Sequence, residues 1–523
     1  MDEKETKLWH RPLSVILPSA VFAVLALALG IFLLGVYLQE NYHVYESETI
    51  APTCTAQGYV RHTCRLCGVS YSDTFTAGGH IYSAPYTIRE ATAKTVGIRA
   101  VRCESCGDCR LTEIPPLVEL PELSIVGDLS AAGGAEGAKV SVTYDNYDVY
   151  FTATALLRVQ GFTSAGFPKK NYNIRLYRDE EMTSHCRVDL GYGSWGSQWR
   201  YTLKANYIDR SHARNIVSCR LFGQMTQTRR STLEELLAAP NGGCTDGFPV
   251  RVTLNGSYYG LYTLNIPKNK WMFGMDEEMY PHSAILTAQM HSSSNNFRST
   301  TDLYTTTDWS VNYCSTDTDY DWLNDSLNDL IRFVRDSDKT TFRRHAAEHL
   351  DVAAVLDYTI MCFAMYGPDN WDKNMLLSTY DGKIWVPTLY DADCSFGLHW
   401  DGQSFYDQGT LDQCRPTVVT RDRFWTGNLL LTRTVHAFFD DFCNRYWELR
   451  ETVLSEENII GTFAAFFDSV PAGAYEEDRD AWRTLPDPTD PCSGEKNDLS
   501  QIRYFVRHRM ALLDEAMENL RIE

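Results

Sequence analysis

The sequence predicts an α+β protein in three parts: an N-terminal transmembrane helix, two small repeats held together by Cys and His side chains, and one large domain. Three observations lead to this prediction. The first is an uncharged apolar run near the N-terminus, and the second is a Cys-rich stretch that repeats at an offset of 39 residues. The third is the order of patterns in the rest of the 523-residue chain, where strand-like runs come first and helix-like runs follow.

The composition is that of a folded protein with an acidic surface. Hydrophobic residues make up 44% and charged residues 22% of the chain, which excludes a disordered or fibrous protein. There are 48 Lys and Arg against 68 Asp and Glu, so the formal net charge is −20. Nucleic-acid binders neutralise phosphates with a basic face, and we therefore expect no nucleic-acid partner. An acidic surface, or a site that collects divalent cations, fits this charge.

Residues 13–38 form the expected membrane span. The segment LSVILPSAVFAVLALALGIFLLGVYL has no charged residue and is long enough to cross a hydrocarbon core of about 30 Å as a helix. A cleaved signal peptide is the alternative, but its apolar core is normally only about 7–15 residues long. Three Lys or Arg residues precede the span and the next is Arg61, so the positive-inside rule places residues 1–12 in the cytoplasm. We expect a single-pass protein of the cell membrane with the bulk of its chain outside the cell.

Residues 40–116 contain two related Cys/His repeats. Cys-x2-Cys followed by Gly stands in each repeat, at 64–68 and 103–107, and this turn lets two thiolates grip one tetrahedral Zn²⁺. Each repeat offers one His and three Cys. The candidate ligand sets are His43, Cys54, Cys64 and Cys67, then His80, Cys103, Cys106 and Cys109. In a second division of these ligands, His80 closes the first site instead.

The repeats need disulfides or a bound metal for stability, because units of about 39 residues bury too little core to be stable alone. In an oxidising compartment the six cysteines offer three disulfides as an alternative to zinc. The His at matching places in the two copies favours zinc. The stretch resembles small zinc-ribbon-like repeats found on bacterial surface proteins, and we expect structural Zn²⁺ there.

Beyond this stretch, residues 117–523 read as one large domain. Runs rich in β-branched and aromatic residues predict strands within 140–176. Asp209 is positioned to cap a helix that runs to Gln224. Sheet structure should therefore dominate the first part of this domain.

A hairpin and a set of helices follow. Residues 249–266 predict two strands joined by an Asn-Gly turn. The stretch 282–320 is rich in Ser, Thr, Asn and Asp and predicts a long polar loop. Helical patterns are then expected at 322–335, 339–349, 351–365, 425–450, 456–469 and 499–520.

The chemistry is concentrated in residues 367–397. Gly367-Pro368 should end the preceding helix, and Asp369 and Asn374 then stand in the D-x4-N relation of a kinase catalytic loop. There the Asp accepts the substrate proton and the Asn holds a metal ion. The runs MLLST and KIWVPTL predict a hairpin that returns Asp391 beside this loop. One Asn and one or two Asp suit Mg²⁺, which prefers oxygen ligands. The alternative is a turn-rich connection in which these side chains only cap helices and turns.

With these residues in view, the span from about 120 to 520 resembles the spore-coat-protein-H (CotH) kinase family, an atypical branch of the protein-kinase-like fold. The matching blocks are RVQGFTS with PKKNY, LKANYID with RN, LNG with YGLY, DNWDKN, and YDAD with FG. They stand in order at 158–172, 203–215, 254–262, 369–374 and 390–397. The resemblance implies a two-lobed domain with a sheet-rich first lobe and a helical second lobe.

The resemblance also implies roles for single residues. Asp369 would be the catalytic base, Asn374 and Asp391 would be metal ligands, and Asp393 would be a second or supporting ligand. Lys169 or Lys170 would pair with phosphate. Strand alternation puts these two lysines on opposite faces, so the choice between them stays open. Nucleotide contacts would also come from Gly161, Ser164, Arg214 and Lys373, although Arg214 in a surface ion pair is an equal alternative.

Two departures from the family pattern concern activity. Many relatives have His where Trp371 stands, and an acidic residue where this chain has Asn265 and Ile266. The expected function is a membrane-anchored extracytoplasmic kinase that uses ATP with Mg²⁺ or Mn²⁺ to phosphorylate Ser or Thr of a secreted or envelope protein. The alternatives are a non-catalytic surface module that binds a partner during envelope assembly, or nucleotide-dependent transfer of another group.

Overall fold

The structure is a computed structural model, and it divides into two compact units, Met1–Leu117 and Val118–Glu523. It describes residues 13–89, 97–114, 119–146, 148–161, 163–230, 232–275, 278–402, 426–471, 473–483 and 499–522. The expected cytoplasmic residues 1–12 lie outside the described residues, and so do the residues on both sides of the expected boundary between 116 and 117.

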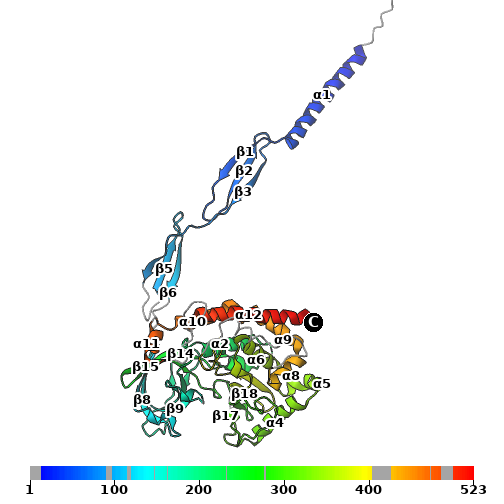
Figure 1. The fold of residues 1–523 in the computed structure, drawn as a ribbon. Helices are drawn as coiled ribbons and strands as arrows, with labels where there is room; N and C mark the ends of the chain where they lie inside the picture. The colour runs from blue at the N-terminus through cyan, green and yellow to red at the C-terminus, as the bar shows by residue number, and fades with distance from the viewer. Residues whose placement is uncertain are drawn as a thin grey trace, which may run out of the picture. The chain divides into compact units, whose positions relative to one another are not determined.

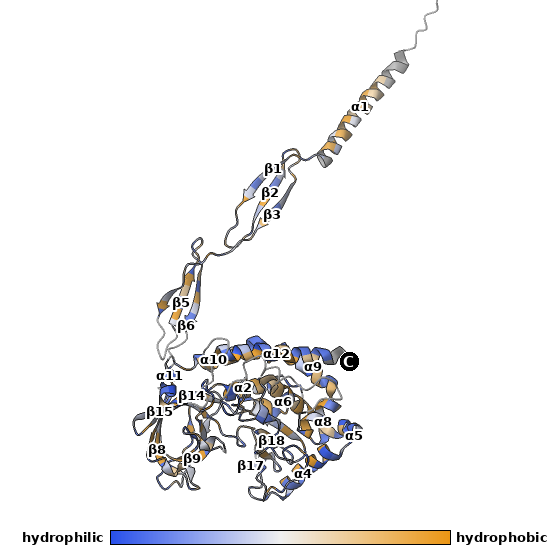
Figure 2. Ribbon diagram, in the orientation of Figure 1, coloured by the Kyte–Doolittle hydropathy of each residue, from blue (hydrophilic) through white to orange (hydrophobic). Residues whose placement is uncertain are grey.

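The first unit begins with the apolar helix α1, Leu13–Asn41 (Figure 1). Its segment Ala20–Leu38 is long and apolar enough to cross a membrane, and none of it is buried within the protein. Figure 2 shows its hydrophobic colouring. A signal sequence near an N-terminus passes the same test of length and composition, so membrane anchorage by α1 is taken up below as a proposal.

Each Cys/His repeat forms a three-stranded antiparallel sheet. The strands of the first are β1 Tyr45–Ile50, β2 Gly58–Cys64 and β3 Ser70–Thr76, and those of the second are β4 Tyr86–Arg89, β5 Gly97–Arg102 and β6 Cys109–Ile114. Gly68 and Gly107, which follow the two Cys-x2-Cys motifs, have φ of 75° and 76°. A side chain is strained at this φ, which is why both turns use glycine.

The first part of the large unit is a closed barrel of seven strands in the order β10-β13-β15-β14-β7-β8-β9. These are β7 Glu122–Val126, β8 Ala138–Asp145, β9 Tyr150–Gln160, β10 Asn171–Tyr177, β13 Arg200–Lys204, β14 Gly247–Leu254 and β15 Ser257–Asn265. The predicted hairpin is β14–β15, and its turn residues Asn255 and Gly256 both have positive φ, as the two-residue turn requires. Closure removes the exposed edges that an open sheet would leave.

A second, four-stranded sheet has the order β17-β16-β18-β19. Its strands are β16 Ala284–Ala288, β17 Trp309–Cys314, β18 Met375–Thr379 and β19 Trp385–Leu389. The expectation of one long polar loop at 282–320 is therefore wrong, because two strands lie within it. All five residues of β16 are buried, but a run this short does not stand out among polar neighbours in the sequence.

Helices complete the large unit: α2 Arg214–Thr228, α3 Glu234–Ala238, α4 Asp321–Asp336, α5 Lys339–His345, α6 Val352–Met365, α8 Leu429–Ala437, α9 Phe439–Arg450, α10 Glu456–Asp468, α11 Ala474–Ala481 and α12 Leu499–Ile522 (Figure 1). Several boundaries differ from prediction. The helix expected from Asp209 begins five residues later, since the Asp209 carboxylate accepts from the backbone N–H groups of Ser211 and Arg214 in the preceding turns. The helix expected at 425–450 is divided at Phe438.

The apolar helix α6 positions the candidate site. It lies in the core, and it ends at Tyr366, whose φ is 48°. The short 3-10 helix η5, Pro368–Trp371, follows immediately and leads into β18. A core helix, a tight turn and a buried hairpin thus fix the backbone that carries residues 369–391.

Candidate functional site

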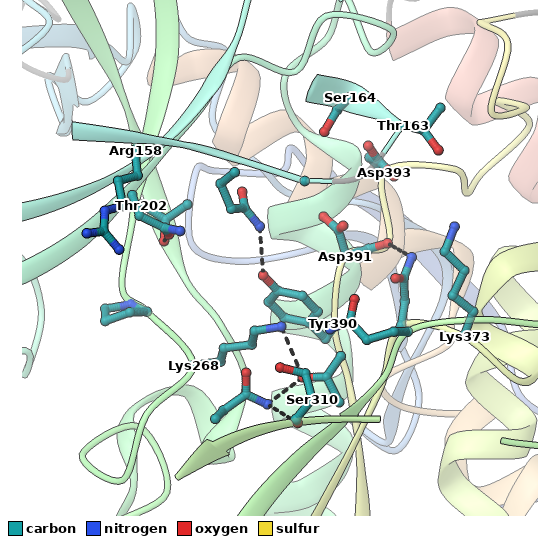
Figure 3. Close-up of a pocket in the computed structure, with 18 of the residues that line it drawn as sticks. Arg158, Thr163, Ser164, Thr202, Lys268, Ser310, Lys373, Tyr390, Asp391 and Asp393 are labelled. Carbon is teal, nitrogen blue, oxygen red and sulfur yellow. Dashed lines mark hydrogen bonds between the residues drawn. The ribbon is translucent and has the colours of Figure 1, made fainter. Parts of the chain in front are cut away.

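A cleft of about 820 Å³ is lined by the barrel strands β9, β10 and β13, by β16 and β17, and by the segments after α6 and β19 (Figure 3). Several of the residues that line it come from the sequence blocks described above. From the catalytic-loop region these are Asp369, Lys373, Asn374, Tyr390, Asp391 and Asp393, and from the barrel Arg158, Gly161 and Ser164. Residues more than 200 positions apart in the sequence therefore face one space.

Asn374 and Asp391 are the candidate metal ligands, and they lie together. The Asn374 Nδ2 donates to the backbone carbonyl of Asp391 at 3.2 Å. Both residues have left-handed backbone conformations, with φ of 58° and 50°. Asn and Asp tolerate this region better than other side chains, but it remains unfavourable and concentrates at functional sites. The two side chains are thus held in place by the surrounding fold.

The two aspartates after β19, Asp391 and Asp393, have pKa values that are shifted in opposite directions. Burial raises the pKa of Asp391, but the Lys204 ammonium, 2.7 Å from its Oδ1, outweighs this and holds the pKa below its ordinary value. Burial and the neighbouring Asp391 raise the pKa of Asp393 to about 7. With the side-chain oxygen of Asn374, these carboxylates form an all-oxygen donor set at one end of the cleft. That donor set fits Mg²⁺ or Mn²⁺.

Asp369, the candidate base, lies on η5 between the side chains of Lys373 and His291. Lys373 Nζ donates to its Oδ2 at 3.2 Å, and His291 Nε2 lies 3.6 Å from its Oδ1. The His291 Nδ1 is 2.5 Å from Asp372 Oδ1. Sequence reasoning missed His291, which stands in the stretch expected to be a polar loop. Trp371 packs its ring against Phe363.

The two lysines expected to pair with phosphate do not line this cleft. Lys169 is buried, and its Nζ donates to Asp478 at 2.8 and 2.9 Å and to the Leu261 carbonyl at 2.6 Å. Lys170 Nζ donates to the Ala165 carbonyl at 2.7 Å. Both lysines lie just before β10, and Lys169 lines a small second pocket that shares Asp391 and Asp393 with the cleft.

Two other lysines contact residues that line the cleft. Lys204, at the end of β13, pairs with Asp391. Lys268, just beyond β15, lines the cleft, donates to Thr287 Oγ1 at 3.0 Å and lies 4.2 Å from the Tyr390 ring centroid (Figure 3). Burial lowers the pKa of Lys268 to about 8. Lys204 belongs to the LKAN block, but its sequence context does not indicate which carboxylate it meets.

Of the remaining residues expected to contact the nucleotide, two line the cleft and one does not. Gly161 and Ser164 line the cleft, and a Cβ added at Gly161 would lie 2.0 Å from Ser164 Oγ. Arg214 does not line it. That side chain is fully buried, and its Nη1 donates to Asp209 Oδ1 at 2.6 Å. Arg214 is therefore neither a phosphate contact nor a surface pair, but part of a buried ion pair at the start of α2.

In the first unit the Cys and His side chains gather into two groups. The larger consists of Cys54, His80, Cys103 and Cys106, with ligand atoms all within 4.8 Å of one another. The Cys54 and Cys103 sulfurs are 3.6 Å apart, and Cys106 Sγ lies 3.3 Å from His80 Nδ1. Tetrahedral Zn–S bonds of about 2.3 Å put sulfurs roughly 3.8 Å apart, so the donor set fits zinc.

The smaller group holds His43, Cys64 and Cys67, with Cys67 Sγ 3.2 Å from His43 Nδ1. The division by repeat is thus corrected: Cys54 joins the ligands of the second repeat, and exposed Cys109 belongs to neither group. Strand pairing explains the difference, because the loop after β1 carries Cys54 away from its own Cys-x2-Cys turn. All thirteen cysteines among the described residues are free thiols.

Comparison with known families supports the chemistry that this cleft suggests. The family model described as CotH kinase protein matches residues 157–513, which is more than half of the chain. The match begins within β9 and includes both halves of the cleft and most of α12. No curated protein matches the sequence.

Proposed function

Since the chain belongs to the CotH kinase protein family, we propose that it transfers the terminal phosphoryl group of ATP, with Mg²⁺ or Mn²⁺, to Ser or Thr hydroxyls of a secreted or envelope protein. One observation supports this most directly. Asp369, Asn374 and Asp391 line a single cleft in the order base, metal-binding Asn and metal-binding Asp along the chain.

In this proposal each side chain has a defined task. Asp369 accepts the proton of the acceptor hydroxyl, and its contact with Lys373 orients it. Asn374, Asp391 and Asp393 hold the divalent cation, which when bound neutralises charge on the phosphates. Catalysis of this kind is mainly positioning and electrostatic stabilisation, and the fixed backbone of Asn374 and Asp391 supplies the positioning.

The lysines that replace the expected pair extend the cationic surface for phosphate. Lys204 sits beside Asp391 and Lys268 lines the same cleft, so both place positive charge next to the metal aspartates. A lysine binds phosphate as a compact point charge. We assign Lys204 and Lys268, rather than Lys169 or Lys170, to the phosphates.

The first unit suggests how the enzyme is held. We propose that α1 anchors the chain, that residues 1–12 are cytoplasmic, and that structural Zn²⁺ stabilises the two repeats between membrane and catalytic unit. The basic residues before the span and the two Cys/His groups support this arrangement.

The test is paired nucleotide binding and labelled-phosphate transfer by the full chain in detergent. Asp369→Ala should keep ATP-Mg²⁺ affinity near wild type and lower transfer by about 10²–10⁴-fold, the usual contribution of a positioned base. Asp391→Ala should weaken metal-dependent nucleotide binding as well. Asp325→Ala, at an exposed position of α4, is the matched control and should change neither.

The outcomes separate the candidate functions. If both cleft variants bind and transfer as wild type does, the assignment of this cleft is wrong. If wild type binds ATP-Mg²⁺ but labels no protein, the chain is a nucleotide-binding surface module, and the loss of His at position 371 becomes the first change to reverse.

A further inference from the structure

Three arginines lie on one face of the barrel and line the cleft: Arg158 on β9, Arg175 on β10 and Arg200 on β13. Arg175 pairs in register with Arg200, and Arg158 pairs with Asn173, two residues before Arg175. Because side chains alternate between the faces of a strand, all three arginines point the same way. We call this set the arginine wall.

The arginine wall lacks anionic partners in the part of the chain that the structure describes. None of the three forms an ion pair there, although the protein has 20 more acidic than basic side chains. Arg158 donates only to the Glu136 carbonyl, at 3.4 Å. Arg200 lies over the Trp199 ring at 4.1 Å, and its Nε is buried without a hydrogen-bond partner. Buried donors are normally satisfied, so this surface is built for something that the chain itself does not supply.

The arrangement is also electrostatically unfavourable by itself. Arg175 and Arg200 are directly opposite across the β10–β13 pair, where like charges destabilise a sheet. Burial and the nearby Arg175 lower the pKa of Arg200. The pKa of the neighbouring His185 is lowered as well, by burial and then by nearby arginines. The fold maintains a local positive field that an anionic ligand would relieve.

The arginine wall is at the far side of the cleft from the carboxylates. In Figure 3, Arg158 lies on one side and Asp391 and Asp393 on the other, with Tyr390 and Lys268 between them. Arg200 and Lys204 are four residues apart on the same strand, which is roughly 13 Å at about 3.3 Å per residue. Since Lys204 contacts Asp391, the wall is about 13 Å from the metal end.

We propose that the arginine wall binds a carboxylate or phosphate group of the acceptor polypeptide, about four residues from the hydroxyl that receives the phosphoryl group. This rests on the proposed kinase function and adds a substrate class to it: acidic or already phosphorylated Ser/Thr segments. An extended chain spans at most about 3.3–3.6 Å per residue, which converts 13 Å into about four residues. Arginine forks match both carboxylate and phosphate.

A nucleotide alone does not account for the wall. The triphosphate is assigned to the metal end, beside Lys204 and Lys268, and the base and ribose carry no charge. The cleft of about 820 Å³ is near the upper end of the roughly 300–1,000 Å³ that a small-molecule site occupies, which leaves room for a second ligand.

The experiment uses the full chain in detergent and fluorescent peptides with one central Ser. Glu, phosphoserine or Gln is placed four residues before or after that Ser. Peptide affinity is measured by anisotropy with and without ATP-Mg²⁺, in wild type and in Asp369→Ala. We expect wild type to bind the Glu or phosphoserine peptide about tenfold or more tightly than the Gln peptide. Of the Glu and phosphoserine peptides, the one that binds more tightly shows which anion the arginine wall selects.

The variants are Arg175→Gln and Arg200→Gln, singly and together, with Arg175→Lys to keep the charge. Arg178→Gln is the matched control, an exposed arginine just beyond the same strand. The Gln variants should lose the preference for the anionic peptide and keep ATP affinity, whereas Arg175→Lys should keep part of the preference. Their melting temperature should stay level or rise, because like-charge repulsion is relieved.

Three results would overturn the proposal. They are equal binding of Glu, phosphoserine and Gln peptides by wild type, a fall in ATP affinity in the Gln variants, or a melting temperature several degrees lower in them than in Arg178→Gln. The second would assign the wall to the nucleotide, and the third would make it structural. Peptide binding is measured without turnover. A failure of the arginine-wall proposal can therefore be distinguished from a failure of the proposed kinase function.

Discussion

The buried ion pair that joins α11 to the barrel offers the sharpest test of the energetics. Asp478 accepts from Lys169 Nζ at 2.8 and 2.9 Å and from the Leu261 N–H at 2.8 Å. His212 Nε2 lies 3.2 Å from Asp478 Oδ2. Lys169 and His212 are almost completely buried. Asp478→Ala would therefore leave a buried ammonium without its counter-charge, and breaking a buried pair in this way costs about 3–5 kcal/mol.

The adjacent residue provides a matched control. Glu477, on the same helix, pairs with Arg251, and both side chains are more than one-third exposed. Exposed ion pairs are typically worth about 0–1 kcal/mol, because water already solvates both charges. Asp478→Ala should therefore destabilise the large unit at least about three times as much as Glu477→Ala. The two substitutions remove the same charge at neighbouring positions.

Urea denaturation followed by tryptophan fluorescence measures both free energies of unfolding. Burial raises the pKa of Asp478, but Lys169 and His212 outweigh this and hold the pKa well below its ordinary 3.8. The stabilisation is therefore complete above about pH 4 and is lost as the pH falls further. The double variant Lys169→Met with Asp478→Leu should recover most of the loss. Equal destabilisation by the Asp478 and Glu477 substitutions at pH 7 would refute this reasoning.

The remaining predictions concern metal, protonation and domain independence. Metal analysis should find one to two zinc per chain, with Cys103→Ser removing about one and Cys109→Ser removing none; stoichiometric disulfides without metal would contradict this. Because burial lowers its pKa to about 8, Lys268 at pH 8 should have roughly 100 times more neutral amine than a model-peptide lysine with a pKa of about 10.4, and acylation mapped by mass spectrometry should level off above pH 9. A Lys268 rate that keeps rising to pH 10 would refute this. A fragment of residues 117–523 should melt cooperatively, whereas recovery only as aggregate would show that the two units share a core.

Local patterns predicted much of the fold correctly. The β14–β15 hairpin follows from an Asn-Gly turn between two strand-like runs, and α4, α6, α10 and α12 lie within a residue or two of the predicted ranges. The misses have local causes too. β16 is a short buried run inside a polar stretch, and the start of α2 was displaced because Asp209 bonds the turns before the helix.

The candidate site was predicted where its residues are neighbours in the chain. Asp369, Asn374 and Asp391 were found because a turn and one hairpin connect them, and these spacings are set by the covalent chain. Lys204, Lys268 and His291 were not given roles. They come from three separate segments of the chain, and no pattern within any one of them indicates a partner 80 to 190 residues away.

By itself, the sequence determined which segments are apolar, where the chain must turn, and which side chains have chemistry to offer. Tertiary structure decided which charges meet. It paired Lys169 with Asp478, gave Lys204 to Asp391, moved Cys54 to the ligands of the second repeat, and gathered three arginines on one face of the barrel. The physical reason is that helix and turn preferences act over a few residues, whereas the energy of a charge depends on the charges and solvent around it. Those surroundings are set only when distant strands pair and exclude water.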